Sequence, residues 1–537
     1  MHSIMMLLAQ ATLTMASPTT YAVGNIADSA NAIQPLDGFI SYSIEFSSFP
    51  DFAGNKSNPN DFSNNLLDNL GAFSGIKPYI RVGGNTQDFA IYNSELTFAL
   101  NGTYNLSRSA DYPTTIEIGP SYFESYGTWP NVKFSHGFNM GGNHDGRQWE
   151  TLLQTVPLAC KALGIDKLYL WEYGNEPDLF SPAVRPTDYN ESDYVAEWLN
   201  GTRAIRTALE QNCPDLLEND TYAYLAPSFA GTNNHLKAPR TWADGINADS
   251  NIKLFSSHNY ISGAETPGVT LQNTLMNHTR TVLSVGAHTA DNATIHPGIP
   301  YILGETNSLF HQGRPGLSDT FGAALWAVDF ALHCAAAGIG RVHFHMGTNY
   351  RYASWQPIPT SKSPIGTKPP YYGNIATSFF LGPPGTLIAS LPFSSNTNAS
   401  TDTDVAYAAY SPAGALSRIL VLNLRAYNYT LDGTGGGALN PEKRGETTYR
   451  FTGVGAGVGS EKREGEVLVR RLHANGSDAV TGITWDGWSY NYELDHGKPV
   501  RLENVTVGDK VGVVDGAVEV RVPDSEAVIL DFGGEDD

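Results

Sequence analysis

Cysteine is scarce in this chain of 537 residues, which has only Cys160, Cys213 and Cys334. The count is odd and no two cysteines form a CxxC pair, so neither a zinc knuckle nor a disulfide framework is encoded. At most one bridge can form. Because free cysteine is among the most often buried residue types, we expect buried thiols on helices.

Positive charge is also scarce, with 33 Lys and Arg against 54 Asp and Glu and a formal net charge of −21. Such a surface repels phosphate backbones and anionic membranes, so the sequence argues against a nucleic-acid partner. It also disfavours a densely sulfated polysaccharide. Neutral glycans and small acidic sugars stay open as ligands.

Long hydrophobic runs are missing beyond the N-terminal segment, so no membrane association through a spanning helix is expected. Residues 1–18 form a short apolar stretch that ends in small residues and resembles a secretory signal peptide. Sequons for N-glycosylation recur along the chain, for example at Asn55, Asn190 and Asn504. Together these features predict a secreted, extracellular glycoprotein.

Apolar β-rich runs alternate with helix-length segments between residues 36 and 382. Apolar residues recur every three or four positions in segments 61–73, 148–163, 192–209 and 319–337, which is typical of amphipathic helices. Eight runs are typical of strands: 39–46, 78–85, 132–140, 167–175, 222–230, 253–261, 300–306 and 341–347. This alternation predicts a (β/α)8 TIM barrel of the α/β class. An open doubly wound sheet is the alternative, which the count of eight disfavours.

From residue 383 to 537 the pattern changes to short runs in which polar and apolar residues alternate. Glycine-rich turns separate runs such as 405–410, 418–424 and 518–522, and no helix-length pattern is present. These features predict a β-sandwich. Residues 19–35 precede the first barrel strand, and we expect them to add a strand to that sandwich.

Two glutamates stand at the carboxyl ends of predicted barrel strands: Glu176 closes the fourth and Glu305 the seventh. Catalytic residues of TIM barrels come from this end, so we expect both in one cleft. Hydrolysis of a glycosidic bond with retention needs an acid and a carboxylate nucleophile about 5–5.5 Å apart. The pair therefore predicts a retaining glycoside hydrolase.

Neighbouring residues assign the two roles. Asn175 directly precedes Glu176 and can hydrogen-bond a sugar 2-hydroxyl. Nearby aromatic residues can raise the pKa of Glu176, so that it begins as the acid. Glu305 is then the nucleophile, and Tyr260 at the end of strand six can donate a hydrogen bond to it.

No metal or other cofactor is expected. His343 and His345 alternate on strand eight and so point the same way, but no third ligand is indicated nearby. We therefore expect His345 to line the pocket.

Four further residues have simple structural or peripheral interpretations. Arg81 is expected to be a structural cation, and Glu172, deeper on strand four, a supporting carboxylate. Asp319 is interpreted as a helix N-cap. Trp355, in the loop after strand eight, is a candidate for stacking on a sugar.

Five ordered stretches make the chain resemble glycoside hydrolase family 79, the β-glucuronidase and heparanase family. The stretches are Tyr79–Asn85, Tyr173–Pro177, Gly304–Ser308, Leu317–Phe321 and Gly347–Tyr350. Asn-Glu-Pro alone is shared by many retaining barrels, whereas the ordered set is specific. The resemblance implies a barrel followed by a sandwich. It also implies a retaining exo-β-glucuronidase that releases terminal glucuronic acid, with or without a 4-O-methyl group, from glycans or small glucuronides.

The resemblance also implies residues that bind the sugar. Glu45 looks like a residue that binds a sugar hydroxyl, and Asn85 lines the same subsite. His258 and Tyr260 are expected to flank the nucleophile.

Recognition of the uronate carboxylate is implied for Tyr350 or Tyr352, after strand eight. The chain departs from the family a few residues beyond the nucleophile. The family often has a tyrosine there, and this chain has Phe310, which offers no hydroxyl. Recognition of the uronate carboxylate is therefore either absent at that point or made by a neighbouring residue.

Two alternatives to an exo-acting enzyme stay open. An endo-β-glucuronidase of the heparanase type is disfavoured by the acidic charge. A carbohydrate-binding protein without catalysis is disfavoured because both carboxylates and Asn175 are present. The expected partner is a carbohydrate, a glucuronide, and we expect a monomer.

Overall fold

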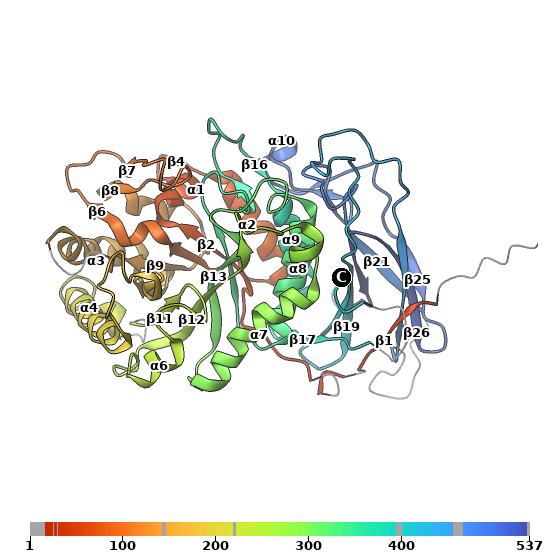
Figure 1. Ribbon diagram of the computed structural model, residues 1–537, viewed down its shortest axis with the longest axis horizontal. Helices are drawn as coiled ribbons and strands as arrows, with labels where there is room; N and C mark the ends of the chain where they lie inside the picture. Colours follow the sequence, from red (N-terminus) through yellow and green to blue (C-terminus); the bar gives the residue numbers. More distant parts are fainter. Residues whose placement is uncertain are drawn as a thin grey trace, which may run out of the picture.

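A closed barrel fills one half of the molecule, and antiparallel strands fill the other (Figure 1). The computed structural model describes residues 17–24, 26–28, 31–141, 146–218, 222–393, 400–454 and 465–533. The expected signal peptide therefore lies, except for its last two residues, outside the described residues.

Eight parallel strands form the barrel. Strand β14 pairs with β2, which closes the ring. The predicted (β/α)8 barrel is confirmed, and each predicted run overlaps one strand. In chain order the strands are β2 (Ile40–Glu45), β5 (Ile80–Gly83), β9 (Phe134–Phe138), β10 (Leu168–Tyr173), β11 (Tyr224–Phe229), β12 (Ile252–Gly263), β13 (Tyr301–Phe310) and β14 (Val342–Met346).

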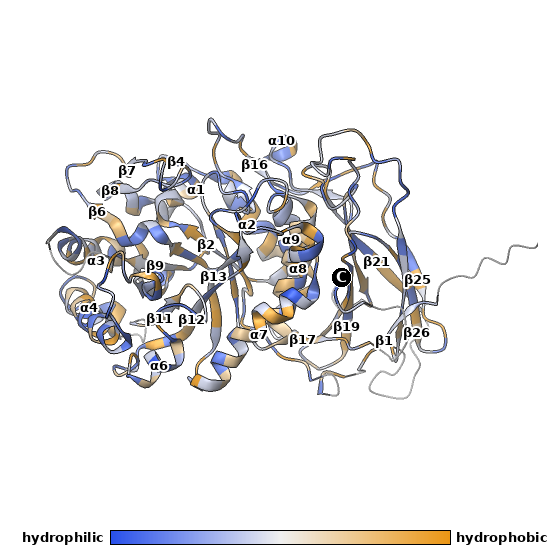
Figure 2. Ribbon diagram, viewed as in Figure 1, coloured by the Kyte–Doolittle hydropathy of each residue, from blue (hydrophilic) through white to orange (hydrophobic). Residues whose placement is uncertain are grey.

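Helices cover the outside of the barrel, so several strands, such as β2 and β11, are buried along their whole length. Hydrophobic residues are spread over the barrel strands and the helices around them (Figure 2). Asn60 begins the first long helix by accepting a hydrogen bond from the Ser63 N–H at 3.0 Å. The long helices are α2 (Asp61–Ser74), α3 (Gly146–Lys167), α4 (Glu191–Asn212), α7 (His278–Ile295), α8 (Phe321–Ala336) and α9 (Pro369–Leu381).

Short elements fill the connections between the barrel strands. The short helices are α1 (Phe49–Ala53), α5 (Asp215–Glu218), α6 (Ala238–Ala243) and, in the C-terminal part, α10 (Tyr492–Asp495). The short strands are β3 (Gly54–Asn55), β4 (Asn58–Pro59), β6 (Ala90–Tyr92), β7 (Leu100–Thr103), β8 (Thr115–Ile118), β15 (Trp355–Gln356) and β16 (Gly366–Thr367).

The N-cap of α8 differs from the prediction. Thr320 is the N-cap residue, whereas Asp319 lies one residue outside and accepts a hydrogen bond from the Gly316 N–H at 2.7 Å. The carboxylate of Asp319 therefore stabilises the turn that leads into the helix. The cap prediction for Asp319 was wrong by one position.

Two sheets make up the C-terminal part: a small mixed sheet and a large antiparallel one. The small sheet contains β1 (Thr19–Ala22), β20 (Glu446–Thr452) and β26 (Ala517–Pro523), and β1 runs parallel to β20. A hydrophobic cluster that includes Tyr21, Phe451 and Leu530 draws on both sheets. The large sheet has the order β17 (Leu387–Ser390), β18 (Asp404–Tyr410), β19 (Leu416–Asn423), β27 (Glu526–Asp531), β21 (Glu466–His473), β22 (Thr484–Trp485), β23 (Trp488–Ser489), β24 (Val500–Arg501), with β25 (Lys510–Gly512) beside β21.

Helices α8 and α9 lie between the barrel and the large sheet (Figure 1). The Tyr407 hydroxyl of β18 donates a buried hydrogen bond to Asp329 Oδ1 of α8 at 2.8 Å. Phe379 of α9 packs against Trp485 of β22 with ring centroids 5.2 Å apart. The sheet therefore covers helices that also pack on the barrel.

A disulfide joins Cys160 of α3 to Cys213, the C-cap residue of α4. The expectation of free thiols was wrong for this pair, because packing of α3 against α4 brings the two Cα atoms to 6.3 Å, a distance that a disulfide spans. Cys334 is a buried free thiol. Among the described residues, no helix has both the length and the apolar character that crossing a membrane requires.

Candidate functional site

Glu176 and Glu305 meet at the carboxyl ends of the barrel strands. Glu176 follows β10, and Glu305 lies within β13. One carboxylate oxygen of each lies within 4.8 Å of the other. This spacing matches the short separation of about 5–5.5 Å in retaining glycosidases and leaves no room for the intervening water of the inverting class.

Two donors contact the carboxylate of Glu305. Arg81 Nη1 donates to Oε2 at 2.6 Å, and the Tyr260 hydroxyl donates to Oε1 at 2.7 Å. Burial alone would raise the pKa of Glu305. The charges of His345 and Arg81, with the hydrogen bond from Tyr260, outweigh burial and hold that pKa below its usual range. Glu305 is therefore an ionised carboxylate.

Arg81 connects both ends of this site and is completely buried. Its Nε donates to Glu172 Oε2 at 2.8 Å, and its Nη2 donates to Asn175 Oδ1 at 2.7 Å. The structural-cation interpretation was therefore too narrow, since the guanidinium also contacts Glu305 directly. A planar fork of donors suits this bridging of separate acceptors better than a lysine would.

Glu176 has the opposite electrostatic environment. Burial, followed by the negative charge of Glu305, raises its pKa well above the ordinary carboxyl value. The Nδ1 of His258 lies 2.9 Å from Glu176 Oε1 and 3.9 Å from Glu305 Oε2. His258, expected beside the nucleophile, thus contacts the acid more closely. Burial lowers the pKa of His258 to about 4, so its imidazole is neutral near pH 7.

The backbone at Glu176 is left-handed, with φ 52° and ψ 49°. A non-glycine residue in this region costs about 1–2 kcal/mol, so surrounding contacts must hold it. Its N–H donates to the Ser228 carbonyl at 3.0 Å, across to the end of β11. This turn directs the side chain of Glu176 toward Glu305.

Glu45, at the end of β2, occupies another corner of the site. Its Oε1 accepts hydrogen bonds from the Thr86 N–H at 2.9 Å and the Thr86 hydroxyl at 2.5 Å. Its Oε2 accepts from the Tyr350 hydroxyl at 3.0 Å and lies 3.4 Å from His345 Nε2. The sequence did not single out Thr86, whose signal was its place directly after Gly83-Gly84-Asn85.

The other expected sugar-binding residues lie around the same two carboxylates. Tyr352 is buried, with its ring centroid 6.0 Å from that of Tyr260. Asn85 is exposed and accepts a hydrogen bond from Asn175 Nδ2 at 3.4 Å. The structure thus brings together ten of the residues chosen from the sequence: Glu45, Asn85, Asn175, Glu176, His258, Tyr260, Glu305, His345, Tyr350 and Tyr352.

Trp355 does not belong to this set. Its ring is completely buried, and its Nε1 donates to the Ser63 hydroxyl of α2 at 2.9 Å. It also packs edge-on against Tyr42 of β2. The prediction that Trp355 stacks on a sugar was wrong, because the loop after β14 folds this ring under the barrel surface.

The segment 104–114, between β7 and β8, is anchored beside the pocket. Asp111 Oδ2 accepts from Arg351 Nη1 at 2.7 Å, and its Oδ1 accepts from Lys362 Nζ at 3.1 Å. Tyr112 follows; burial raises its pKa, as do the nearby charges of Glu45 and Glu176. Tyr112 is therefore within reach of the charges of both carboxylates.

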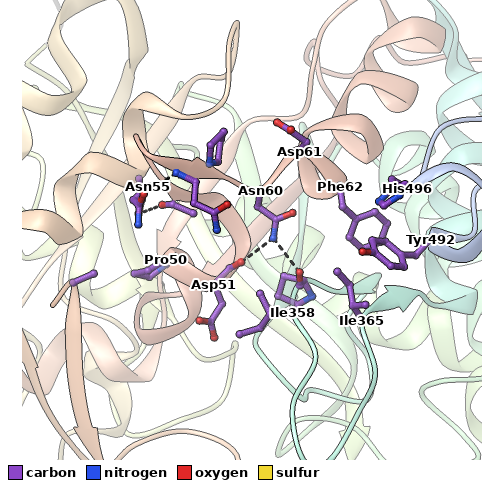
Figure 3. A pocket seen from close by; sticks show the side chains of 16 residues that line it. Pro50, Asp51, Asn55, Asn60, Asp61, Phe62, Ile358, Ile365, Tyr492 and His496 are labelled. Carbon is purple, nitrogen blue, oxygen red and sulfur yellow. Dashed lines mark hydrogen bonds between the residues drawn. The ribbon is translucent and has the colours of Figure 1, made fainter.

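Residues of this segment also line a groove. A cavity of about 710 Å³ is lined by Tyr104, Asp111 and Thr348, among others. A second cavity of about 440 Å³ shares Asp51 and Ile358 with the first and reaches Tyr492 and His496 of the C-terminal part (Figure 3). The groove therefore extends from the barrel loops to the second half of the molecule.

Relatives of known name match most of the chain. A β-glucuronidase of Neurospora crassa is 58% identical over 501 residues, which cover 90% of this chain and 89% of the relative. A β-glucuronidase of Aspergillus niger is 53% identical, over 93% of this chain and 91% of the relative. The chain belongs to the fungal β-glucuronidases of glycoside hydrolase family 79. Residues 406–529 match the model of the family 79 C-terminal β domain.

A solved structure shares the fold of this family 79 chain. A 4-O-α-L-rhamnosyl-β-D-glucuronidase from Fusarium oxysporum is 24% identical and superposes with a TM-score of 0.75, covering 96% of this chain and 100% of its own. An α-L-arabinofuranosidase of family 51 from Bifidobacterium longum has a TM-score of 0.58 at 11% identity. Both show that a barrel followed by a β-sheet domain is a shared architecture.

Proposed function

We propose that the chain is a retaining exo-β-glucuronidase that releases terminal glucuronic acid from glycans or small glucuronides. The observation that carries the proposal is the closeness of Glu176 and Glu305, one with a raised and the other with a lowered pKa. Two carboxyl groups whose environments separate their pKa values are suited to opposite roles in acid–base chemistry. The identity of the sugar is inferred from the relatives, which are named β-glucuronidase.

In the first step Glu305 attacks the anomeric carbon of the glucuronosyl residue. The carbon–oxygen bond to the leaving group breaks, and the proton of Glu176 moves to that oxygen. A covalent glucuronosyl ester forms on Glu305. Arg81 and Tyr260 keep the attacking carboxylate ionised and oriented, and Asn175 is placed to bind the sugar 2-hydroxyl.

In the second step Glu176, now ionised, acts as the base. It takes a proton from a water molecule, whose oxygen attacks the anomeric carbon and displaces Glu305. The two inversions together retain the β configuration. His258 is neutral beside the protonated Glu176, since its pKa lies near 4.

The far end of the sugar is proposed to lie at Glu45. In the ring of strands, β2 stands three places from β10, so Glu45 enters the site from a different side than Glu176. Segment 104–114 is anchored on this side by Asp111. We propose that this segment closes the end of the site beyond the glucuronic acid, which favours exo action. It disfavours the endo-acting alternative.

Tyr352 is the proposed partner of the uronate carboxylate. Both tyrosines after β14 are buried, but Tyr350 already donates its hydroxyl hydrogen to Glu45. Tyr352 lies beside Tyr260. Burial raises the pKa of Tyr352 most, and the charge of Glu305 raises it further. A hydroxyl that is still protonated at neutral pH can donate to a carboxylate.

Secretion remains a proposal that two observations support. The disulfide between Cys160 and Cys213 forms in oxidising compartments and is uncommon in the cytosol. The N-glycosylation sequons agree with that route. We further propose a monomer without membrane association, divided into a signal peptide at 1–18, a sandwich strand within 19–35, a catalytic barrel at 36–382 and a sandwich at 383–537.

A panel of chromogenic glycosides tests the proposed function. The purified chain is expected to hydrolyse an aryl β-glucuronide and to leave the matching β-glucoside and β-galactoside intact. Methanol added as acceptor should yield methyl β-glucuronide, detected by the anomeric proton in NMR spectra. Cleavage of the glucoside alone, or formation of the α-anomer, would refute the assignment of sugar or mechanism respectively.

A further inference from the structure

A buried carboxylate that takes no part in the chemistry above lies behind Asn175. Asp88 belongs to a 3₁₀ turn at Asn85–Phe89, between β5 and β6. Its side chain is buried. Burying a carboxylate is unfavourable unless hydrogen bonds satisfy it, so its partners show what it stabilises.

Both oxygens of Asp88 accept hydrogen bonds from backbone N–H groups. Oδ1 accepts from the Met140 N–H at 2.8 Å, and Oδ2 accepts from the Asn175 N–H at 2.7 Å. Met140 follows β9 and Asn175 follows β10. One carboxylate thus joins the carboxyl ends of two neighbouring barrel strands.

These bonds begin where the strand ladder ends. The pairing of β9 with β10 stops at Phe138 and Tyr173, and the Gly174 N–H donates to the Phe138 carbonyl at 3.1 Å. The next N–H along β10, that of Asn175, has Asp88 as its acceptor instead of a strand. Asp88 therefore extends the ladder by one residue, up to the residue before Glu176.

The turn that Asp88 holds is conformationally unfavourable. Gly174 has φ 86° and Glu176 has φ 52°. A Cβ on Gly174 would lie 2.8 Å from Met140 Sδ, so the two strand ends are tightly packed. Burial raises the pKa of Asp88 to about 7, while the two N–H bonds favour its ionised form. In that form the bonds are charge-assisted and about twice as strong as neutral ones, which suits Asp88 to hold this turn.

We propose that Asp88 is a positioning residue for the acid/base: through the Asn175 peptide it fixes where the carboxyl of Glu176 stands relative to the leaving oxygen. Asp88 touches neither the sugar nor Glu176. It acts on the first step through proton donation and on the second through proton abstraction. The nucleophile Glu305 is held from other strands, by Arg81 and Tyr260. Its one link to the turn that Asp88 holds is Arg81, which also donates to the Asn175 side chain.

The test compares substrates that differ in their need for an acid. Hydrolysis of phenyl β-glucuronide needs proton donation to the phenol oxygen. The dinitrophenolate of 2,4-dinitrophenyl β-glucuronide leaves without a proton. Asp88→Asn keeps the size of the side chain but replaces one acceptor oxygen by a donor. We expect kcat/KM to fall by about 10²-fold or more for the phenyl substrate, within the usual contribution of general acid catalysis. The fall for the dinitrophenyl substrate should be several times smaller.

Azide gives a second readout of positioning. On the dinitrophenyl substrate, kcat of Asp88→Asn should fall because the second step needs the base. Azide attacks the anomeric carbon of the ester on Glu305 without deprotonation, releases the carboxylate and forms β-glucuronyl azide. Added azide should therefore restore kcat of the variant and leave the wild type unchanged.

Asp478 offers a matched control in the C-terminal part. It is a buried carboxylate that accepts two backbone N–H bonds, from Tyr429 at 2.8 Å and Thr430 at 3.1 Å. Asp478→Asn should lower the melting temperature and leave the ratio of the two substrates at the wild-type value. This separates loss of a buried carboxylate from loss of positioning.

Several outcomes overturn the proposal. It is wrong if Asp88→Asn lowers kcat/KM for both substrates by the same factor or leaves both values unchanged. It is also wrong if azide does not raise kcat of the variant. If Asp88→Asn does not fold, Asp88→Glu, which pushes Asn175 outward, must show the same selective loss; failure of both variants to fold assigns a structural role instead. The inference rests on the proposed function, whose failure is distinguishable because the wild type would then cleave neither glucuronide.

Discussion

Arg81 Nη1 lies 2.6 Å from Glu305 Oε2, and both side chains are buried. The same guanidinium pairs with Glu172, so one cation serves two carboxylates below the sugar site. The pair therefore combines a role in stability with a role in keeping the nucleophile ionised.

Replacing Arg81 with Met should leave two buried carboxylates without their cation. Breaking a buried ion pair from one side costs about 3–5 kcal/mol, so the variant should unfold at a lower urea concentration than the wild type. Without the charge of Arg81 the pKa of Glu305 should rise. The acid limb of the pH profile of the residual activity should therefore move to higher pH. Unchanged urea midpoints would contradict the ion-pair account.

The pH profile of kcat/KM should be bell-shaped. Activity requires Glu305 ionised and Glu176 protonated. The pKa of Glu305 is lowered, so the acid limb should lie below the ordinary glutamate value of about 4.3, and the raised pKa of Glu176 places the alkaline limb above it. With a dinitrophenyl leaving group, Glu176→Gln should lose the alkaline limb and keep the acid limb. Loss of the acid limb instead would reverse the two assignments.

The Tyr260 hydroxyl should contribute through its hydrogen bond to Glu305. A hydrogen bond to a charged group contributes about 1.5–3 kcal/mol, so Tyr260→Phe should lower kcat/KM by roughly 10- to 100-fold. Tyr410→Phe is the matched control, since that hydroxyl donates to the Gly24 carbonyl in the sandwich. Equal kcat/KM of the two variants would contradict a contribution of the Tyr260 hydroxyl to catalysis.

Release of segment 104–114 should relax the preference for an unsubstituted sugar. Asp111→Ala removes the acceptor of Arg351 and Lys362. The ratio of kcat/KM for an aryl β-glucuronide with and without a 4-O-glycosyl group should shift toward the substituted substrate. Glu265→Ala, at an exposed contact with His311, is the control and should keep the wild-type ratio. An unchanged ratio in Asp111→Ala would show that this segment does not restrict that end of the sugar.

Thiol counting tests the disulfide. Under denaturing conditions without reductant, Ellman's reagent should detect one thiol per chain, that of Cys334, and three after reduction. Cys160→Ser should destabilise the fold by about 2–4 kcal/mol, as loss of a bridge across a long loop does. Three thiols before reduction would contradict the bridge.

Much of this architecture could be predicted because it is written in local patterns. The barrel strands are short β-rich runs that alternate with helix-length segments, and Glu176 and Glu305 come at or near the carboxyl ends of their predicted runs, where topology brings side chains together. The family 79 motifs added Glu45 and Tyr350, which no periodicity would reveal.

What the sequence missed depends on contacts between distant segments. The pairing of Cys160 with Cys213 required the packing of α3 on α4, and the burial of Trp355 required the path of a loop. Asp88 was not singled out because its partners are backbone N–H groups, which have no side-chain signature. His258 pairs with Glu176 because a twelve-residue strand, β12, carries its ring across to the acid.

Helix α8 has almost every residue buried, although it lies on the outer layer of the barrel. In a barrel that stood alone, the outward side of such a helix would face water and be polar. Here the large sheet takes the place of solvent, and even its one carboxylate, Asp329, is matched to Tyr407 of that sheet. A chain shortened to its first 382 residues would thus expose the hydrophobic outer side of α8. We therefore expect the barrel to need the large sheet to stay folded in solution.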